Sequence, residues 1–205
     1  MELVLVRHAE PIRIGAEESG GEAVDPELTR RGFDQARRLA TWLGAEPVHH
    51  VVSSPLRRAT ETAQPVAAAH RLDVEIVPGL QEWDAGADHY IPVEELRETK
   101  DDRWQAMIEG RWEDYGGENP ERFRDRIVPT LNAIIEAHPG ETVVVVCHGG
   151  VINVYLAALL GLTHHLWFDP GYTSISRVRA ARAGARSLAS LNETAHLFAV
   201  REAAP

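Results

Sequence analysis

Short apolar runs alternate along this chain with longer stretches in which apolar residues recur at helical spacing. Strand patterns occupy residues 3–6, 50–54, 73–77 and 142–147. Strands that alternate with helices favour βαβ units, so the pattern predicts an α/β fold with a largely parallel sheet. Nearer the end of the chain, residues 174–178 and 187–191 flank Ala183-Gly184-Ala185 and predict a hairpin.

Helical spacing is clearest after Thr29, a residue type that caps helix N-termini. The expected helix ends near Gly44, and its apolar positions are Phe33, Ala36, Leu39, Ala40 and Leu43. Further helices are expected at residues 55–70, 93–110 and about 120–137, and from Gly149 onward. We expect Pro129 to kink the helix that contains it, because proline removes a backbone donor.

Three of the predicted strands end in residues that can carry chemistry. Arg7-His8 follows the first, Ser54 leads from the second into Arg57-Arg58, and His148 follows the fourth. In open α/β sheets the carboxyl ends of the strands are where ligands bind. Arginine followed by histidine could by itself be a strand-end salt bridge with a surface imidazole. Three such strand ends together instead favour a functional site.

These segments, in this order and spacing, resemble the histidine phosphatase superfamily, the group that also contains the cofactor-dependent phosphoglycerate mutases. The matching segments are residues 3–10, 25–36, 53–63, 80–86 and 143–150. The resemblance implies a phosphoglycerate mutase-like, three-layer sandwich whose central, mostly parallel sheet is flanked by helices. It also implies that residues 1–205 form a single domain, with a cap segment around 82–118.

The resemblance implies phosphoryl transfer through a phosphohistidine, with His8 as the nucleophile. A neutral imidazole can form such a covalent intermediate near neutral pH. The negative charge of the phosphate opposes attack, so guanidinium groups must bind its oxygens, and Arg7 and Arg58 match those positions. His148 would be a further donor, and the helix that Gly149 opens would favour an anion at its N-terminus. Arg57 is expected to be solvated.

Glu82 is the expected proton donor to the leaving group. Leu80 before it and Gly86 after it match the acid-bearing segment of the family, although a solvated loop carboxylate is the alternative. Relatives usually continue glycine-x-x-glutamate-glycine, whereas residues 86–90 here read Gly-Ala-Asp-His-Tyr. The signature glycine after the histidine is replaced by Ala9.

A further departure lies at Ile14, which stands where many family members carry a phosphate-contacting asparagine. This change removes one polar contact. It indicates either a different substrate or a compensating group, for which Arg13 is the candidate.

Charge and composition limit the possible partners. The formal charge of −10 argues against nucleic-acid or anionic membrane surfaces. The single cysteine, Cys147, excludes an internal disulfide, and we read it as a small buried hydrophobe. The chain shows no leader pattern, and its longest apolar stretch, 151–162, is too short to span a bilayer. We therefore expect a cytoplasmic protein that binds a small phosphorylated substrate; a homo-oligomer is left open.

No histidine, cysteine or carboxylate spacing resembles a zinc site, so neither a metal nor a cofactor is expected. The histidine pairs His49-His50 and His164-His165 would point to different faces in extended structure. Three tryptophans, Trp83, Trp104 and Trp112, fall in the cap segment. They could line a pocket for an apolar or ring-bearing substrate, or they could pack in the core.

The sequence thus predicts a metal-independent phosphomonoester hydrolase for a small phosphorylated metabolite. A cofactor-dependent phosphoglycerate mutase is the first alternative, since it would share all the core residues. Such mutases are generally longer, so the 205 residues here favour hydrolysis. A non-catalytic interaction module on the same fold is the second alternative. The expected catalytic and phosphate-binding residues are all present, which argues against a non-catalytic module: Arg7, His8, Arg58, Glu82 and His148.

Overall fold

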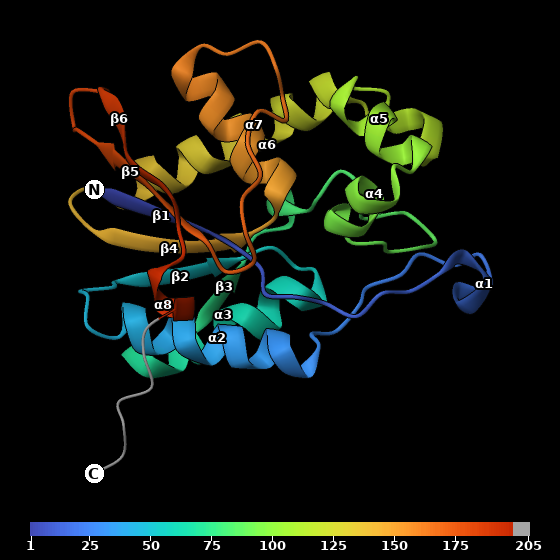
Figure 1. The fold of residues 1–205 in the computed structure, drawn as a ribbon. Coiled ribbons are helices and arrows are strands. Elements are labelled where there is room, and N and C mark those ends of the chain that lie inside the picture. Colours follow the sequence, from blue (N-terminus) through green and yellow to red (C-terminus); the bar gives the residue numbers. More distant parts are fainter. Residues whose placement is uncertain (199–205) are drawn as a thin grey trace.

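The computed structural model describes residues 1–198, and its centre is a six-stranded sheet in the order β3-β2-β4-β1-β5-β6 (Figure 1). The strands are β1 (Glu2–Arg7), β2 (His50–Ser53), β3 (Val74–Ile76), β4 (Thr142–Cys147), β5 (Ile175–Ala180) and β6 (Arg186–Glu193). Strands β1 to β4 pair in parallel, whereas β5 runs antiparallel to β1 and to β6. The mostly parallel sheet is confirmed, and the predicted terminal hairpin forms its β5–β6 edge.

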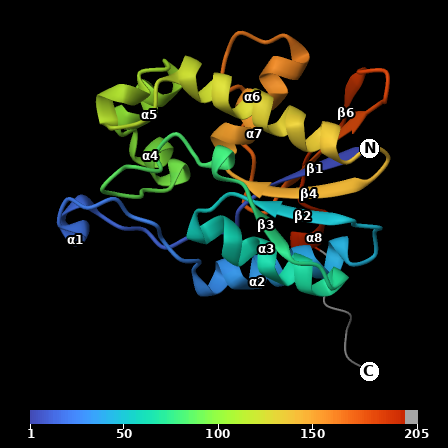
Figure 2. The ribbon, with the colours of Figure 1, turned by 180° about the vertical axis from the view of Figure 1, so that it is seen from behind.

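Helices cover both faces of the sheet, which gives three layers (Figure 2). One layer holds α2 (Arg30–Leu43), α3 (Arg57–His70) and the short α8 (Ala195–Phe198), and the other holds α6 (Pro120–Ala137) and α7 (Gly149–Leu160). Successive side chains of β1 point to opposite faces. Leu3 and Leu5 therefore pack with α6 and α7, while Val4 and Val6 pack with α2 and α3. Burial on both faces explains why the central strands are continuously apolar.

The helix α2 begins and ends where the sequence predicts. The Thr29 side chain accepts a hydrogen bond from the backbone N–H of Gly32, and Gly44 is the C-cap. A Cβ atom on Gly32 would lie 2.1 Å from the carbonyl oxygen of Glu10, so only glycine allows this close approach. Of the five predicted apolar positions of this helix, Phe33 alone is exposed, at 40%, because it lies on the outer side of the first turn.

The stretch of chain between β3 and α6 forms a group of short helices at the carboxyl ends of the strands (Figures 1 and 2). It contains η1 (Pro78–Leu80), α4 (Val93–Thr99), α5 (Asp102–Ile108) and η2 (Trp112–Tyr115), and α1 (Ala16–Ser19) lies nearby in Figure 1. The prediction of one helix over 93–110 is wrong. Lys100 adopts a left-handed φ of 54°, and Asp101 then caps α5 by accepting a hydrogen bond from the Arg103 backbone.

The helix α6 runs through Pro129 without interruption, and the kink stays a prediction. The cysteine Cys147 is buried in β4, as expected, and burial raises the pKa of its thiol. Within residues 1–198, no helix combines the length and apolar character needed to cross a membrane.

Candidate active site

The side chains of His8 and His148 lie beside each other at the carboxyl ends of two paired strands. Because Arg7 pairs with Cys147 in the β1–β4 ladder, the next residue of each strand is a histidine at the same edge. The two imidazole ring centroids are 5.1 Å apart. The guanidinium groups of Arg7 and Arg58 are also buried at this edge, as is the carboxyl group of Glu82. The structure therefore brings all the residues expected in the site together.

The His8 ring is held in one tautomer by the backbone. Its Nδ1 atom lies 2.8 Å from the carbonyl oxygen of Ala9, which can only accept, so Nδ1 carries the proton. The Ala9 backbone N–H in turn donates to Thr62 Oγ1 at 2.9 Å. Burial, then the charges of Arg58 and Arg7, hold the pKa of His8 well below its ordinary value. The Nε2 atom is consequently unprotonated at neutral pH, the state in which an imidazole can act as a nucleophile.

The Arg7 guanidinium is oriented from two sides. Its Nη1 atom donates to Glu94 Oε1 and to the carbonyl oxygen of Pro170, each at 2.7 Å. The guanidinium carbon lies 4.1 Å from the centre of the Tyr172 ring, and the Tyr172 hydroxyl donates to the other carboxylate oxygen of Glu94. Among the described residues, Arg7 Nε has no hydrogen-bond partner, so this donor can serve a ligand.

The two neighbouring arginines at the start of α3 have different environments. The Arg58 side chain is 2% exposed, and its guanidinium lies 4.8 Å from the Tyr90 ring centre and 3.4 Å from Asp84 Oδ1. Its Nε atom also has no partner within residues 1–198. The Arg57 side chain, by contrast, is half exposed and pairs with Glu61 and Glu27. Only Arg58 lines the cavity described below.

The Glu82 carboxyl group is bound to the N-terminus of α7. Its Oε2 atom accepts from the Gly150 backbone N–H at 2.8 Å, and Oε1 accepts from the Trp83 N–H at 3.2 Å. Burial, followed by the charge of Asp84, raises the pKa of Glu82 to about 7, and the two N–H donors oppose this shift. A Cβ atom on Gly150 would lie 2.4 Å from Glu82 Oε1. The Gly150 amide therefore holds Glu82, and in this arrangement it is not open to a substrate anion as the helix N-terminus suggested.

The second histidine, His148, is the N-cap of α7. Its Nε2 atom lies 2.8 Å from Ser54 Oγ, which accepts from the Leu56 N–H. The Ser54 hydroxyl can thus donate to Nε2, which leaves the ring proton on Nδ1. Within the described chain, this Nδ1 atom is buried and has no partner. Burial, then Arg58 and His8, keep the pKa of His148 well below its usual range.

Two of the three departures noted in the sequence, Ile14 and residues 86–90, are in contact in the structure. Ile14 forms a pair of backbone hydrogen bonds with Tyr90, the residue under Arg58, at 2.8 and 3.0 Å. Arg13 pairs with Glu95 at 3.0 Å and is not a cavity-lining residue, so it does not replace the missing polar contact.

Sequence reasoning missed several residues that hold the site. These are Ser54, Thr62, Asp84, Tyr90, Glu94 and Tyr172. Tyr90 is the last residue of the departure at residues 86–90, and Asp84 lies two positions before it, so that departure was the one available signal. Glu94 and Tyr172 lie 87 and 165 positions from Arg7 in the sequence, and no local pattern connects them to it.

The site lies at one end of a cavity of about 360 Å³. Arg7, His8, Arg58, Glu82 and Gly149 line that end, and the cavity continues between the cap helices and residues 166–170. Trp83, Trp104 and Trp112 all line it. Trp112 is also 1% exposed and packs edge-on against Phe123, so this residue both lines the cavity and packs in the core.

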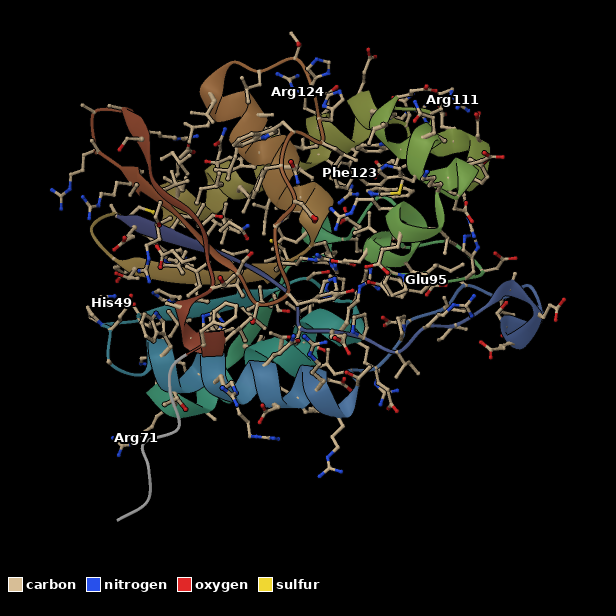
Figure 3. All side chains as sticks on the ribbon, viewed as in Figure 1. His49, Arg71, Glu95, Arg111, Phe123 and Arg124 are labelled. Carbon is tan, nitrogen blue, oxygen red and sulfur yellow. The ribbon has the colours of Figure 1, made fainter. Side chains whose placement is uncertain are left out.

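A separate group of metal-ligand type lies away from this cavity. His50 Nε2 and His138 Nδ1 lie 3.0 and 3.1 Å from Glu141 Oε2. The neighbouring residue His49 is at the opposite end of the molecule from Arg111 of the cap segment (Figure 3). Two imidazoles and a carboxylate could hold a divalent metal. His50 lies in β2, whereas His138 and Glu141 lie in the loop between α6 and β4, which is why sequence spacing did not reveal the group.

Comparisons with known proteins identify the family of this chain. The profile of the histidine phosphatase superfamily (branch 1) matches residues 3–194. Phosphoglycerate mutase-like protein 4 of Arabidopsis thaliana is 36% identical over 157 residues, which cover 74% of this chain and 68% of that protein. Phosphoserine phosphatase 1 of Hydrogenobacter thermophilus is 34% identical over 164 residues, covering 79% and 77%. The crystal structure of a phosphoserine phosphatase from Entamoeba histolytica with 3-phosphoglyceric acid has a TM-score of 0.73 and 27% identity, covering 96% and 98%.

Proposed function

Because this chain belongs to the histidine phosphatase superfamily (branch 1), we propose that it is a phosphomonoester hydrolase that forms a phosphohistidine on His8. The observation that carries the proposal is the state of His8. Its Nδ1–H is held by the Ala9 carbonyl group, so that Nε2 keeps its lone pair between the buried cations Arg7 and Arg58. The substrate is a small phosphorylated metabolite.

In the first step, His8 Nε2 attacks phosphorus and the bond from phosphorus to the leaving oxygen breaks. Arg7 and Arg58 stabilise the charge on the equatorial oxygens, and His148 donates a further hydrogen bond. Protonated Glu82 gives its proton to the departing alkoxide, which leaves as the alcohol. With a pKa of about 7, Glu82 holds that proton in a useful fraction of molecules at neutral pH.

In the second step, water attacks the phosphohistidine and its proton passes to the Glu82 carboxylate. The nitrogen–phosphorus bond breaks, inorganic phosphate leaves, and the starting forms of His8 and Glu82 are restored. Two arginines and His148 supply the positive and donor groups that a catalytic metal would otherwise provide. We therefore propose a metal-independent reaction.

The surrounding organisation is part of the same proposal. Residues 1–205 form one domain, and the segment 82–118 is a cap over the cavity. The protein acts in the cytoplasm. No nucleic acid or membrane takes part, since the chain carries a formal charge of −10 and its proposed phosphate-binding arginines are buried.

The test measures phosphate release from a panel of phosphomonoesters together with covalent labelling. The wild type should release inorganic phosphate and carry a base-stable, acid-labile label. His8→Ala should lose both, whereas His49→Ala, a change of the same kind at the distant end of the sheet, should keep both. Undiminished hydrolysis by His8→Ala would overturn the mechanism. Interconversion of 3- and 2-phosphoglycerate that requires 2,3-bisphosphoglycerate, with little phosphate released, would instead identify a mutase.

A further inference from the structure

The cavity around His8 extends well beyond the space that a phosphoryl group needs. Its volume of about 360 Å³ lies in the range of sites that enclose a whole small molecule. The phosphoryl group occupies only the end with Arg7 and Arg58. The leaving group must therefore lie against the remaining walls, which include Leu96, Met107, Ile108, Leu166 and Phe168.

Two of the four tryptophans that line these walls, Trp112 and Trp167, offer apolar ring surface, because their N–H groups are already used. Trp112 Nε1 donates to the Met107 carbonyl oxygen at 2.9 Å, and Trp167 Nε1 donates to the Asn153 carbonyl oxygen at 3.2 Å. The rings of Trp83 and Trp112 stack at a centroid distance of 5.3 Å. A ligand beside them gains contact area and little hydrogen bonding.

The cations of the cap are neutralised by residues of the cap itself. Apart from Arg7 and Arg58, the guanidinium groups that line the cavity in the described chain are those of Arg103 and Arg111. Arg103 forms a two-pronged pair with Asp101, with distances of 2.8 and 2.6 Å. These hydrogen bonds lower the pKa of Asp101 to about 2.

The second cap arginine, Arg111, is shared between Glu109 and Asp114 at 2.8 and 2.6 Å. Two further carboxylates, Asp84 and Asp169, line the cavity directly. A carboxylate on the substrate would have to displace one of the existing ion pairs and would face these like charges. The Arg103–Asp101 pair is partly buried, with side chains 26% and 28% exposed, so breaking that pair carries a free-energy cost.

Resting on the proposed function, we infer that the preferred substrate is a phosphomonoester of an uncharged, largely apolar alcohol, with a branched chain or a ring. Phosphate esters that carry a second anionic group, such as phosphoserine or phosphoglycerate, are poor substrates of this site. The tryptophan rings and the ion pairs of Arg103 and Arg111 favour an apolar, uncharged leaving group, while Arg7 and Arg58 bind the phosphoryl group.

The test uses ethyl, butyl and hexyl phosphate, whose leaving oxygens have nearly the same basicity. We expect kcat/KM to rise about three- to fourfold for each methylene that is buried. A hexyl phosphate that ends in a carboxylate should fall at least about tenfold below hexyl phosphate itself. Calorimetric titration with the matching alkylphosphonates, which cannot be hydrolysed, measures the same preference without turnover.

A matched pair of variants locates the preference. Ile108 and Ile76 are both 45% exposed, but only Ile108 lines the cavity. Ile108→Asp should reduce the hexyl-to-ethyl ratio of kcat/KM about tenfold, because a carboxylate would meet the apolar chain. Ile76→Asp should leave that ratio unchanged.

The outcomes separate this inference from the proposed function. Hydrolysis of every ester with no dependence on chain length, or a preference for phosphoserine or phosphoglycerate, overturns the inference and leaves the hydrolase intact. Absence of all hydrolysis overturns the hydrolase. In that case, alkylphosphonate affinity that increases with chain length still supports an apolar site. Affinity that does not change with chain length overturns the inference.

Discussion

The carboxyl group of Glu82 and the backbone N–H of Gly150 are joined by a hydrogen bond of 2.8 Å. This contact fixes the proposed acid to the first turn of α7, directly after His148. The acid and the second histidine are therefore positioned by one structural element, although 66 residues separate them in the sequence. A change in the start of α7 would move both groups together.

Glu82→Gln should slow hydrolysis of alkyl phosphates by about a hundredfold or more, because glutamine cannot protonate the leaving oxygen. Hydrolysis of p-nitrophenyl phosphate should fall much less, since the nitrophenolate leaves without a proton. Steady-state kinetics on the two substrates give the comparison. Equal losses on both would exclude the acid role.

The pH profile should reflect the state of Glu82. Burial and the charge of Asp84 raise its pKa to about 7, so the protonated acid is present below that pH and is lost above it. We expect kcat/KM for an alkyl phosphate to fall about tenfold per unit above pH 7. On the acidic side the low pKa of His8 keeps the nucleophile neutral. If the fall in kcat/KM above pH 7 persists unchanged in Glu82→Gln, the fall does not come from Glu82.

Arg58→Ala should lose far more activity than Arg57→Ala. Arg58 is buried at the cavity, whereas Arg57 is half exposed and bound by two glutamates. Removing a guanidinium group from the transition state costs roughly 3 kcal/mol, a factor of about a hundred in rate. Rates under saturating and limiting substrate, with circular dichroism to verify folding, measure the difference. A larger loss for Arg57→Ala would reverse the assignment of the two residues.

Activity should persist after dialysis against a chelator, because arginines supply the positive charge at the phosphoryl end. Vanadate should inhibit, since it adopts the five-coordinate geometry of the transferring phosphorus. A metal bound by His50, His138 and Glu141 would not alter this result, as these residues do not line the cavity. Loss of activity on chelation, with recovery on adding magnesium or zinc, would refute metal independence.

Thr29→Ala should destabilise the protein by about 1 kcal/mol, because it removes the N-cap of α2. The Thr29 hydroxyl also donates to Glu10 Oε1 at 3.0 Å, so the loss includes a second contact. Thr41→Ala is the matched control: it lies in the same helix, is exposed and caps nothing. Urea denaturation of both variants gives the two free energies of unfolding. Equal destabilisation would show that the cap contributes nothing.

The parts of the site that could be predicted are those in which one strand end or helix start delivers the residue. His8 and His148 follow apolar strands directly, and Arg58 lies in the first turn of a helix with clear spacing. The supporting residues could not be predicted in this way. Glu94 contacts Arg7 from a helix in the cap, and that contact depends on how the cap folds back over the sheet.

The cap also shows the limits of helical spacing as a signal. Residues 93–110 keep an apolar period, yet a single left-handed residue at Lys100 divides them into two helices. Lysine has no special preference for that conformation, so the sequence carries no warning there. The role of Asp101 as the N-cap of α5 can be recognised only once the break at Lys100 is known, because an aspartate within a helical pattern does not by itself indicate a helix start.

The place of β1 in the sheet has a consequence for how the chain folds during synthesis. The strand that carries Arg7 and His8 is made first, but its two neighbours are β4 and β5, more than 130 residues later. The backbone of Thr173, just before β5, also bonds the carbonyl oxygens of Arg7 and His8. The proposed nucleophile, His8, therefore lacks its neighbouring strands until β4 and β5 have been synthesised. Such long-range pairing is intrinsically slow, and a nascent chain that ends before β4 lacks His148 and so cannot yet assemble the proposed site.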